Sequence, residues 1–294
     1  MGNSHCSSVA LTGATTHPGV KLATSTLENH SKYETNTAMA DAADTNHFAA
    51  QVPQTTNTTK KRAGATPSKN DFAHSRVASE MVSLALNMTA IQSGPLLLTI
   101  INFGYLPITY NWLCHTAELP GVHKNVIVLA QGEDTETSLK RRWPEVKTVT
   151  VNQWQNELHG PLQFGTVGYI RMMVRRTDVL NALIQANISF VLFETDFVWF
   201  ENPVPDFLDL GRVKDLDLVG TVSTAYMQIM CGAFIYFRNT TRTRKVWAEV
   251  TRLMHELERR VHSKKDRSGA PYGENEQVYL NRLLKVCYIL SGLM

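Results

Sequence analysis

The sequence predicts one α/β domain, with a twisted, mainly parallel sheet and helices on both of its faces, preceded by a disordered tail. Three observations lead to this prediction. Beyond residue 90, apolar runs of strand length alternate with amphipathic stretches of helix length. The hydrophobic fraction of 43% is large enough for a buried core. Residues 1–75, in contrast, contain only eight Ile, Leu, Val or Phe residues among many Ser, Thr, Asn and Ala.

The first half of the domain alternates between strand and helix patterns. Residues 95–102 and 125–131 are continuous apolar runs, which are typical of strands buried on both faces. The stretch 105–119 between them has the length and spacing of a crossover helix. Residues 134–143 begin with an Asp and end before a Pro, which predicts another helix, and residues 147–151 predict a third strand.

The second half opens with a long helix, predicted at residues 166–187 because apolar side chains recur along one stripe. Residues 189–200 return to strand character. Four further elements complete the prediction, namely strands at 217–222 and 233–238 and helices at 240–261 and 274–284. Parallel strands joined by right-handed crossovers place a ligand site at their carboxyl ends.

The amino-terminal segment differs from the rest in composition. Residues 1–80 are predicted to be a disordered low-complexity tail and residues 90–294 the folded domain, because the tail cannot bury enough apolar area to offset its ordering entropy. Its first six residues, MGNSHC, are similar to an N-myristoylation site at Gly2, with Cys6 where Ser or Thr is expected. The sequence contains no run of about 18 apolar residues, so no membrane-spanning segment is predicted. The net charge of +3 is too small to indicate a nucleic-acid partner.

Two carboxylates follow the apolar run that ends at Phe193. Glu194 and Asp196 are one residue apart, so in an extended backbone they point to the same side. Neighbouring carboxylates repel each other unless a cation lies between them, and hard oxygen ligands suit Mg²⁺ or Mn²⁺. The pair therefore indicates a divalent metal site. A pair of solvated acids at the start of a surface loop is the alternative.

The segment ETDFVWFENP at residues 194–203 resembles the "DxDvvWlrdP" signature of the nucleotide-diphospho-sugar transferase family, which has a GT-A fold. Three further motifs resemble the family in the same order: Phe164-Gly165-Thr166 with Gly168, Arg175-Arg176 and Leu180; Cys231-Gly232-Ala233-Phe234 with Tyr236 and Arg238; and Asn275-Glu276-Gln277 with Asn281. Together they cover about residues 95–285. The resemblance is greatest to the plant rhamnogalacturonan-II α-1,3-xylosyltransferase-like enzymes and their animal relatives.

This resemblance implies a metal-dependent glycosyltransferase. Such an enzyme moves a sugar, xylose in the plant relatives, from a UDP-sugar to a hydroxyl of a glycan or glycoprotein, with retention of anomeric configuration. Mn²⁺ or Mg²⁺ would neutralise charge on the departing diphosphate. Family members are usually Golgi proteins with one amino-terminal membrane helix, so the resemblance implies the Golgi, although this sequence shows no signal peptide or such helix.

The resemblance also assigns roles on the donor side of the site. Asp196 would be a direct metal ligand, and Glu194 would act on the metal or on the donor ribose, which makes both of them candidate catalytic residues. Asn102, at the end of the first strand, would help to hold the nucleotide. Arg175 would face the donor or brace the acid pair, and the alternative is an ion pair with Asp178 one turn on.

The last two motifs supply the remaining candidates. Gly232 would let the backbone approach the donor sugar closely, because it has no side chain. Glu276 and Gln277 would lie on the acceptor side. A strand bulge at Gly232 and a solvated position for Glu276 are the alternatives.

Two departures from the family pattern leave rival functions open. Glu194 stands where the family usually has Asp, and relatives carry a further strand with a metal-binding His, so the domain is expected to be truncated at Met294. Both departures would suit a catalytically silent nucleotide-sugar or glycan-binding module on the same fold. A phosphohydrolase with an Asp-x-Asp nucleophile is the other rival, which the Glu at position 194 disfavours.

Overall fold

The computed structural model describes residues 69–92, 94–152, 159–205, 216–222, 229–263, 269–270 and 274–291. All of them belong to the larger of two compact units, Thr66–Met294. The lipidation motif and most of the predicted tail lie outside the described residues. Within the described ranges, no helix has the length and apolar character that crossing a membrane requires.

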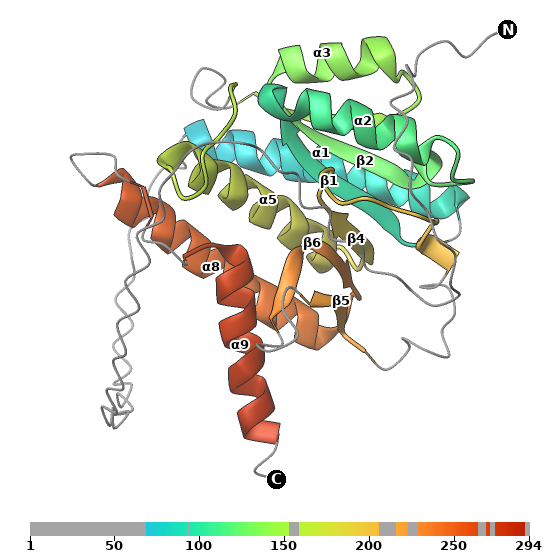
Figure 1. Cartoon of the computed structure of the whole chain (residues 1–294). Helices are drawn as coiled ribbons and strands as arrows, with labels where there is room; N and C mark the ends of the chain where they lie inside the picture. The colour runs from blue at the N-terminus through green and yellow to red at the C-terminus, as the bar shows by residue number, and fades with distance from the viewer. Residues whose placement is uncertain are drawn as a thin grey trace, which may run out of the picture. The chain divides into compact units, whose positions relative to one another are not determined.

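A six-stranded sheet with the order β3-β2-β1-β4-β6-β5 forms the centre of the domain (Figure 1). Its strands are β1 (Leu96–Asn102), β2 (Val126–Gln131), β3 (Lys147–Val151), β4 (Phe190–Phe193), β5 (Leu218–Val222) and β6 (Met230–Phe237). Strands β1 to β4 are mutually parallel, whereas β6 is antiparallel to both of its neighbours. The predicted mainly parallel sheet is therefore confirmed.

Helices pack on both faces of this sheet. They are α1 (Lys69–Ile91), α2 (Leu106–Thr116), α3 (Glu133–Arg142), α5 (Val167–Gln185), α8 (Thr241–His262) and α9 (Glu276–Ser291), with short 3₁₀ turns η1 (Phe103–Tyr105) and η2 (His123–Asn125). Helices α2 and α3 lie on one side of the sheet, and α5 and α8 lie on the other (Figure 1). Because helices cover both faces of the sheet, β1 and β2 are buried at every position and appear in the sequence as continuous apolar runs.

Alternate residues of the strands feed two separate cores. In β1, Leu96, Leu98 and Ile100 join the cluster formed with α1, α5, α8 and α9. Leu97 and Ile101 point the other way and join the cluster formed with α2 and α3. This alternation is the period of two expected of an extended chain, and it fixes the register of the central strand.

Helix α1 corrects the predicted end of the tail. Residues 69–80 were predicted to be disordered and the folded part to begin at 90, but α1 already begins at Lys69. Its buried residues Met81, Ala85 and Met88 recur at helical spacing, and the helix packs on α5, β1 and β3. The prediction failed because it rested on composition and not on helical spacing, although Val77, Val82 and Leu84 also pack against this core.

Strand β4 is shorter than the predicted strand at 189–200. It ends at Phe193, and the backbone then turns, with the Phe197 N–H donating to the Glu194 carbonyl at 3.2 Å. Trp199 is nevertheless buried, because it packs edge-on against Trp112 and Phe193 with ring centroids 5.0 and 5.1 Å apart. An apolar loop packed on the core therefore produced the strand-like pattern.

A cluster of charged side chains joins α5 to α8. His255 Nε2 lies 2.6 Å from Asp178 Oδ1, and Arg175 Nη1 lies 3.3 Å from Asp178 Oδ2. Glu258 faces the same cluster, 3.9 Å from His255 Nδ1 and 3.8 Å from Arg175 Nη2. The hydrogen bond with Asp178 raises the pKa of His255, against the opposing effect of burial.

We expect this cluster to stabilise the protein most below neutral pH. Because the pKa of His255 is higher in the folded state, its contribution is fully present below the unfolded value of about 6.5 and is lost as the pH rises through the folded value. His255→Gln should lower the free energy of unfolding by up to about 1 kcal/mol at a pH of about 5.5, and by much less at a pH of about 9. Urea unfolding at both pH values checks this, and an equal loss at both would contradict it.

Candidate functional site

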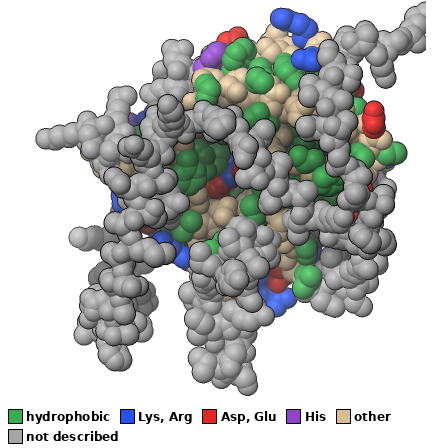
Figure 2. All heavy atoms as spheres, viewed as in Figure 1, with side chains coloured by type: hydrophobic (Ala, Val, Ile, Leu, Met, Phe, Trp, Pro, Cys, Tyr) green, Lys and Arg blue, Asp and Glu red, His purple; other side chains and the backbone are tan. Residues whose placement is uncertain are grey.

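A cavity of about 250 Å³ opens beyond the carboxyl ends of β1 and β4. Its charged and amide residues are Arg176, Glu194, Asp196, Asn275, Glu276 and Gln277. On the face shown in Figure 2, acidic and basic side chains lie together in a hollow bordered by hydrophobic ones. The position at the strand ends is where the sequence predicted a ligand site.

Glu194 and Asp196 both border this cavity. The Glu194 N–H donates to the Ala233 carbonyl at 2.9 Å, which extends the pairing of β4 with β6 by one residue. Thr195 between them is buried, with its hydroxyl 3.3 Å from that of Thr109 on α2. Burial, and then the charge of Glu194, raise the pKa of Asp196. Both acids therefore border one cavity, although the backbone turns at Thr195 and Asp196 and is not extended as the prediction assumed.

Arg176 holds the site together. Its Nη1 donates to Glu194 Oε1 at 3.0 Å, and its Nη2 donates to Glu276 Oε1. The Arg176 side chain is only 6% exposed, and that of Glu276 only 4%. One guanidinium therefore bridges the loop after β4 and the first turn of α9, two segments that are far apart in the sequence.

Glu276 also carries an oxygen without a partner. Its Oε2 is buried and has no hydrogen-bond partner among the described residues, and the residue Glu276 borders the cavity. A buried carboxylate oxygen without a donor is uncommon, because desolvation without a hydrogen bond is costly. This oxygen is therefore available to a donor group of a ligand.

Two side-chain amides of α9 bind the backbone of β6. Asn281 accepts from the Met230 N–H and donates to the Met230 carbonyl, both at 2.9 Å, and Gln277 Oε1 accepts from the Gly232 N–H at 2.8 Å. These contacts lie where the pairing of β5 with β6 is interrupted by a register shift. The amides form hydrogen bonds with backbone groups that have no partner within the sheet.

Gly232 is therefore packed against α9. A Cβ atom at this position would lie 2.8 Å from Gln277 Oε1, which is too close for a normal contact. From the sequence, the missing side chain was expected to make room for a donor sugar. The structure shows that it makes room for Gln277.

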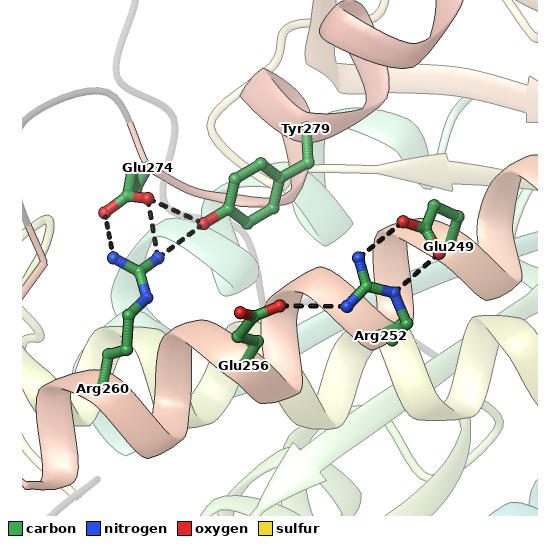
Figure 3. A network of polar contacts seen from close by, with 6 residues as sticks. All are labelled: Glu249, Arg252, Glu256, Arg260, Glu274 and Tyr279. Carbon is green, nitrogen blue, oxygen red and sulfur yellow. Dashed lines mark hydrogen bonds and ion pairs between the residues drawn. The ribbon is translucent and has the colours of Figure 1, made fainter. Parts of the chain in front are cut away.

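An ion pair between Arg260 and Glu274 fixes the residues just before α9 (Figure 3). Arg260 donates to both oxygens of Glu274, at 2.7 and 3.2 Å, and the Tyr279 hydroxyl donates to Glu274 Oε1 at 3.1 Å. Burial and the contact with Glu274 raise the pKa of Tyr279 to about 12. Glu274 precedes Glu276 by two residues, so this pair anchors α8 to the backbone that carries the cavity carboxylate.

Two predicted site residues lie elsewhere. Asn102 is buried and donates from Nδ2 to the Gly160 carbonyl at 2.7 Å, so it positions the segment that leads to α5. Arg175 pairs with Asp178 and Glu258, which was the alternative for this residue. The expectation that Arg175 braces the acid pair is therefore wrong, and it is Arg176 that contacts one member of the pair, Glu194.

Two tyrosines of the site were not predicted from the sequence. Tyr105 and Tyr169 border the cavity, and burial raises the pKa of both hydroxyls. The charges of Asp196 and Glu194 raise that of Tyr105 further. Tyr169 and Arg176 share one face of α5 with two cavity methionines at 172 and 173, and this helical spacing is the signal that could have distinguished Arg176 from Arg175.

Comparison with known protein families identifies a match. Residues 121–286, more than half of the chain, match the model of the family described as nucleotide-diphospho-sugar transferase. The matched range runs from the turn before β2 into α9 and contains both acids, Arg176 and Glu276. A comparison with curated proteins finds no match.

Gly232→Ala should destabilise the protein by about 1 kcal/mol, because Gln277 Oε1, at the flexible end of its side chain, must move away from the new methyl group and lose its hydrogen bond with the N–H of residue 232. Gly160→Ala is the matched control, since no atom lies within 4 Å of its added Cβ. Urea unfolding of both variants checks this, and equal stability would contradict it. Adding Gln277→Ala to Gly232→Ala should recover part of the loss.

Proposed function

Since the chain belongs to the nucleotide-diphospho-sugar transferase family and is a glycosyltransferase by that membership, we propose that its cavity binds a nucleoside diphosphate sugar together with Mn²⁺ or Mg²⁺. The sugar is then transferred to a hydroxyl of a glycan or glycoprotein. The sequence resemblance alone supports four further parts of this proposal. They are UDP as the nucleotide, xylose as the sugar, retention of configuration and the Golgi as location.

The net negative charge of the cavity is the main observation in favour of a bound metal ion. Its described charged residues are one arginine, Arg176, and three acids, Glu194, Asp196 and Glu276. One positive and three negative side chains leave a net charge of about −2 when all are ionised. A diphosphate is itself an anion and would be repelled by such a cavity, and a divalent cation removes this repulsion.

The donor atoms present fit such a cation. Asp196 and Glu194 offer hard carboxylate oxygens on the cavity side, which Mg²⁺ and Mn²⁺ prefer. Within the described ranges, no group of three or more His, Cys, Asp or Glu residues is placed to hold a metal. Sites of this kind use one or two carboxylates and complete the coordination with substrate phosphates and water. When bound, the cation neutralises charge that develops on the leaving diphosphate.

The chain's own residues bind and orient the substrates. Arg176 holds the Glu276 carboxylate in place at the cavity, so its free oxygen keeps a constant position. Glu276 Oε2 accepts a hydrogen bond from a sugar hydroxyl, which replaces the missing partner. Tyr105 and Tyr169 supply aromatic walls that exclude water from the reacting groups.

Asp196→Asn tests this function. We expect it to weaken UDP binding in the presence of Mn²⁺ by about 100-fold and to abolish UDP-sugar turnover, because a cation ligand is lost. Asp134→Asn, at an exposed acid outside the cavity, is the control and should change neither. Calorimetry with UDP and a UDP-release assay measure the two effects.

UDP binding that requires neither Mn²⁺ nor Asp196 would contradict the proposed site. Tight, Asp196-dependent UDP binding without turnover of any UDP-sugar would identify a silent binding module instead.

A further inference from the structure

We infer that Arg176 competes with the divalent cation for Glu194, so that the free protein binds the cation weakly until a nucleoside diphosphate is present. This inference rests on the proposed function. It assigns to Arg176 control over cation affinity and over the order in which cation and nucleotide bind, and it makes Arg176 a positioning residue that acts through Glu194.

The contact geometry makes the competition direct. Arg176 Nη1 lies 3.0 Å from Glu194 Oε1, one of the two oxygens with which Glu194 would hold a cation. The two positive charges cannot share this carboxylate at full strength, because each draws on its negative charge and they repel each other. Coordination of the cation by both oxygens of Glu194 therefore requires its release from Arg176.

Burial makes that release unfavourable in the free protein. Arg176 is almost fully enclosed, and a buried guanidinium that loses a carboxylate partner is left partly uncompensated. Glu194 differs, since 40% of its side chain is exposed, so it is the partner that can move. The resting state of the site is therefore the arginine-bound one.

Glu276 keeps Arg176 in place after Glu194 is released. The planar guanidinium bonds the two carboxylates through different nitrogens, so loss of one contact leaves the other intact. The switch is consequently a side-chain movement of Glu194 and needs no rearrangement of α5 or α9. The single arginine then remains beside the cation as a fixed positive charge.

A bound diphosphate reverses the balance. Its negative charge offsets the repulsion between the cation and Arg176 and supplies oxygens that complete the coordination. Binding of cation and nucleotide is then mutually favourable, and by linkage each tightens the other by the same factor. Removing Arg176 should raise affinity for the cation alone and reduce this mutual tightening.

Titration with Mn²⁺, followed by the electron paramagnetic resonance signal of the free ion, tests the inference with and without UDP. Arg176→Gln should bind Mn²⁺ alone at least about tenfold more tightly than the native chain, since a unit positive charge in contact with a carboxylate that would hold the divalent ion is removed. UDP should then tighten Mn²⁺ binding less than it does in the native chain. Glu276→Gln should act in the opposite direction and weaken Mn²⁺ binding severalfold, because Arg176 is left with Glu194 alone.

Arg175→Gln is the matched control. Arg175 is the neighbouring buried arginine of α5, but it pairs with Asp178 and Glu258. Its loss should destabilise the fold without changing Mn²⁺ affinity. If Arg176→Gln does not fold, Arg176→Lys replaces it, because an ammonium keeps the charge but cannot form the two-nitrogen bridge. That variant should bind Mn²⁺ more tightly than native by a smaller factor.

The outcomes separate this inference from the proposed function. Unchanged or weaker Mn²⁺ binding in the Arg176 variant that folds would overturn the inference, while UDP-dependent Mn²⁺ binding that is lost in Asp196→Asn would leave the proposed function standing. Tighter Mn²⁺ binding in Arg175→Gln as well would also overturn it. If the native chain binds Mn²⁺ neither alone nor with UDP, the proposed function itself fails.

Discussion

The bridge made by Arg176 is the interaction on which the organisation of the site depends. A charged group that is nearly excluded from water must be paired, and Arg176 meets this requirement with two carboxylates from different parts of the chain. Helix α5, the loop after β4 and the start of α9 are thereby fixed to one another. A transferase of nucleotide-activated sugars needs such constancy, since it accelerates its reaction mainly by orienting two substrates.

Around this bridge, several polar residues support the backbone. Gln277 and Asn281 bind β6, Gly232 allows α9 to approach, and the pair of Arg260 with Glu274 anchors the helix from the other side. Residues that look like a binding motif in the sequence thus act largely as supports. Three of the charged groups of the cavity, Arg176, Glu194 and Glu276, are held by one another although they are far apart in the chain.

Sequence reasoning worked where the signal is local. The strands at 95–102, 125–131 and 147–151 were predicted within one residue of their observed bounds, because continuous apolar runs mark strands covered on both faces. The place of the acids at a strand end followed from the rule that ligands bind there, but the turn that carries them did not follow from their spacing. Adjacent helical residues such as Arg175 and Arg176 differ by about 100° in direction, so the choice between them needed the helical spacing of the cavity residues of α5, which the prediction did not use. The contact of Gly232 with Gln277 joins residues 45 apart, for which no local pattern exists.

Helix α1 bears on how this enzyme can be produced. A recombinant fragment that begins at residue 90, where the composition changes, would lack the buried stripe of Met81, Ala85 and Met88. The apolar side chains of α5 that this stripe covers would then face water, and a bare apolar face of this kind promotes self-association. The family match begins still later, at residue 121, and excludes both α1 and the central strand β1. For solubility, the boundary therefore lies before Lys69, inside a stretch that composition alone assigns to the tail.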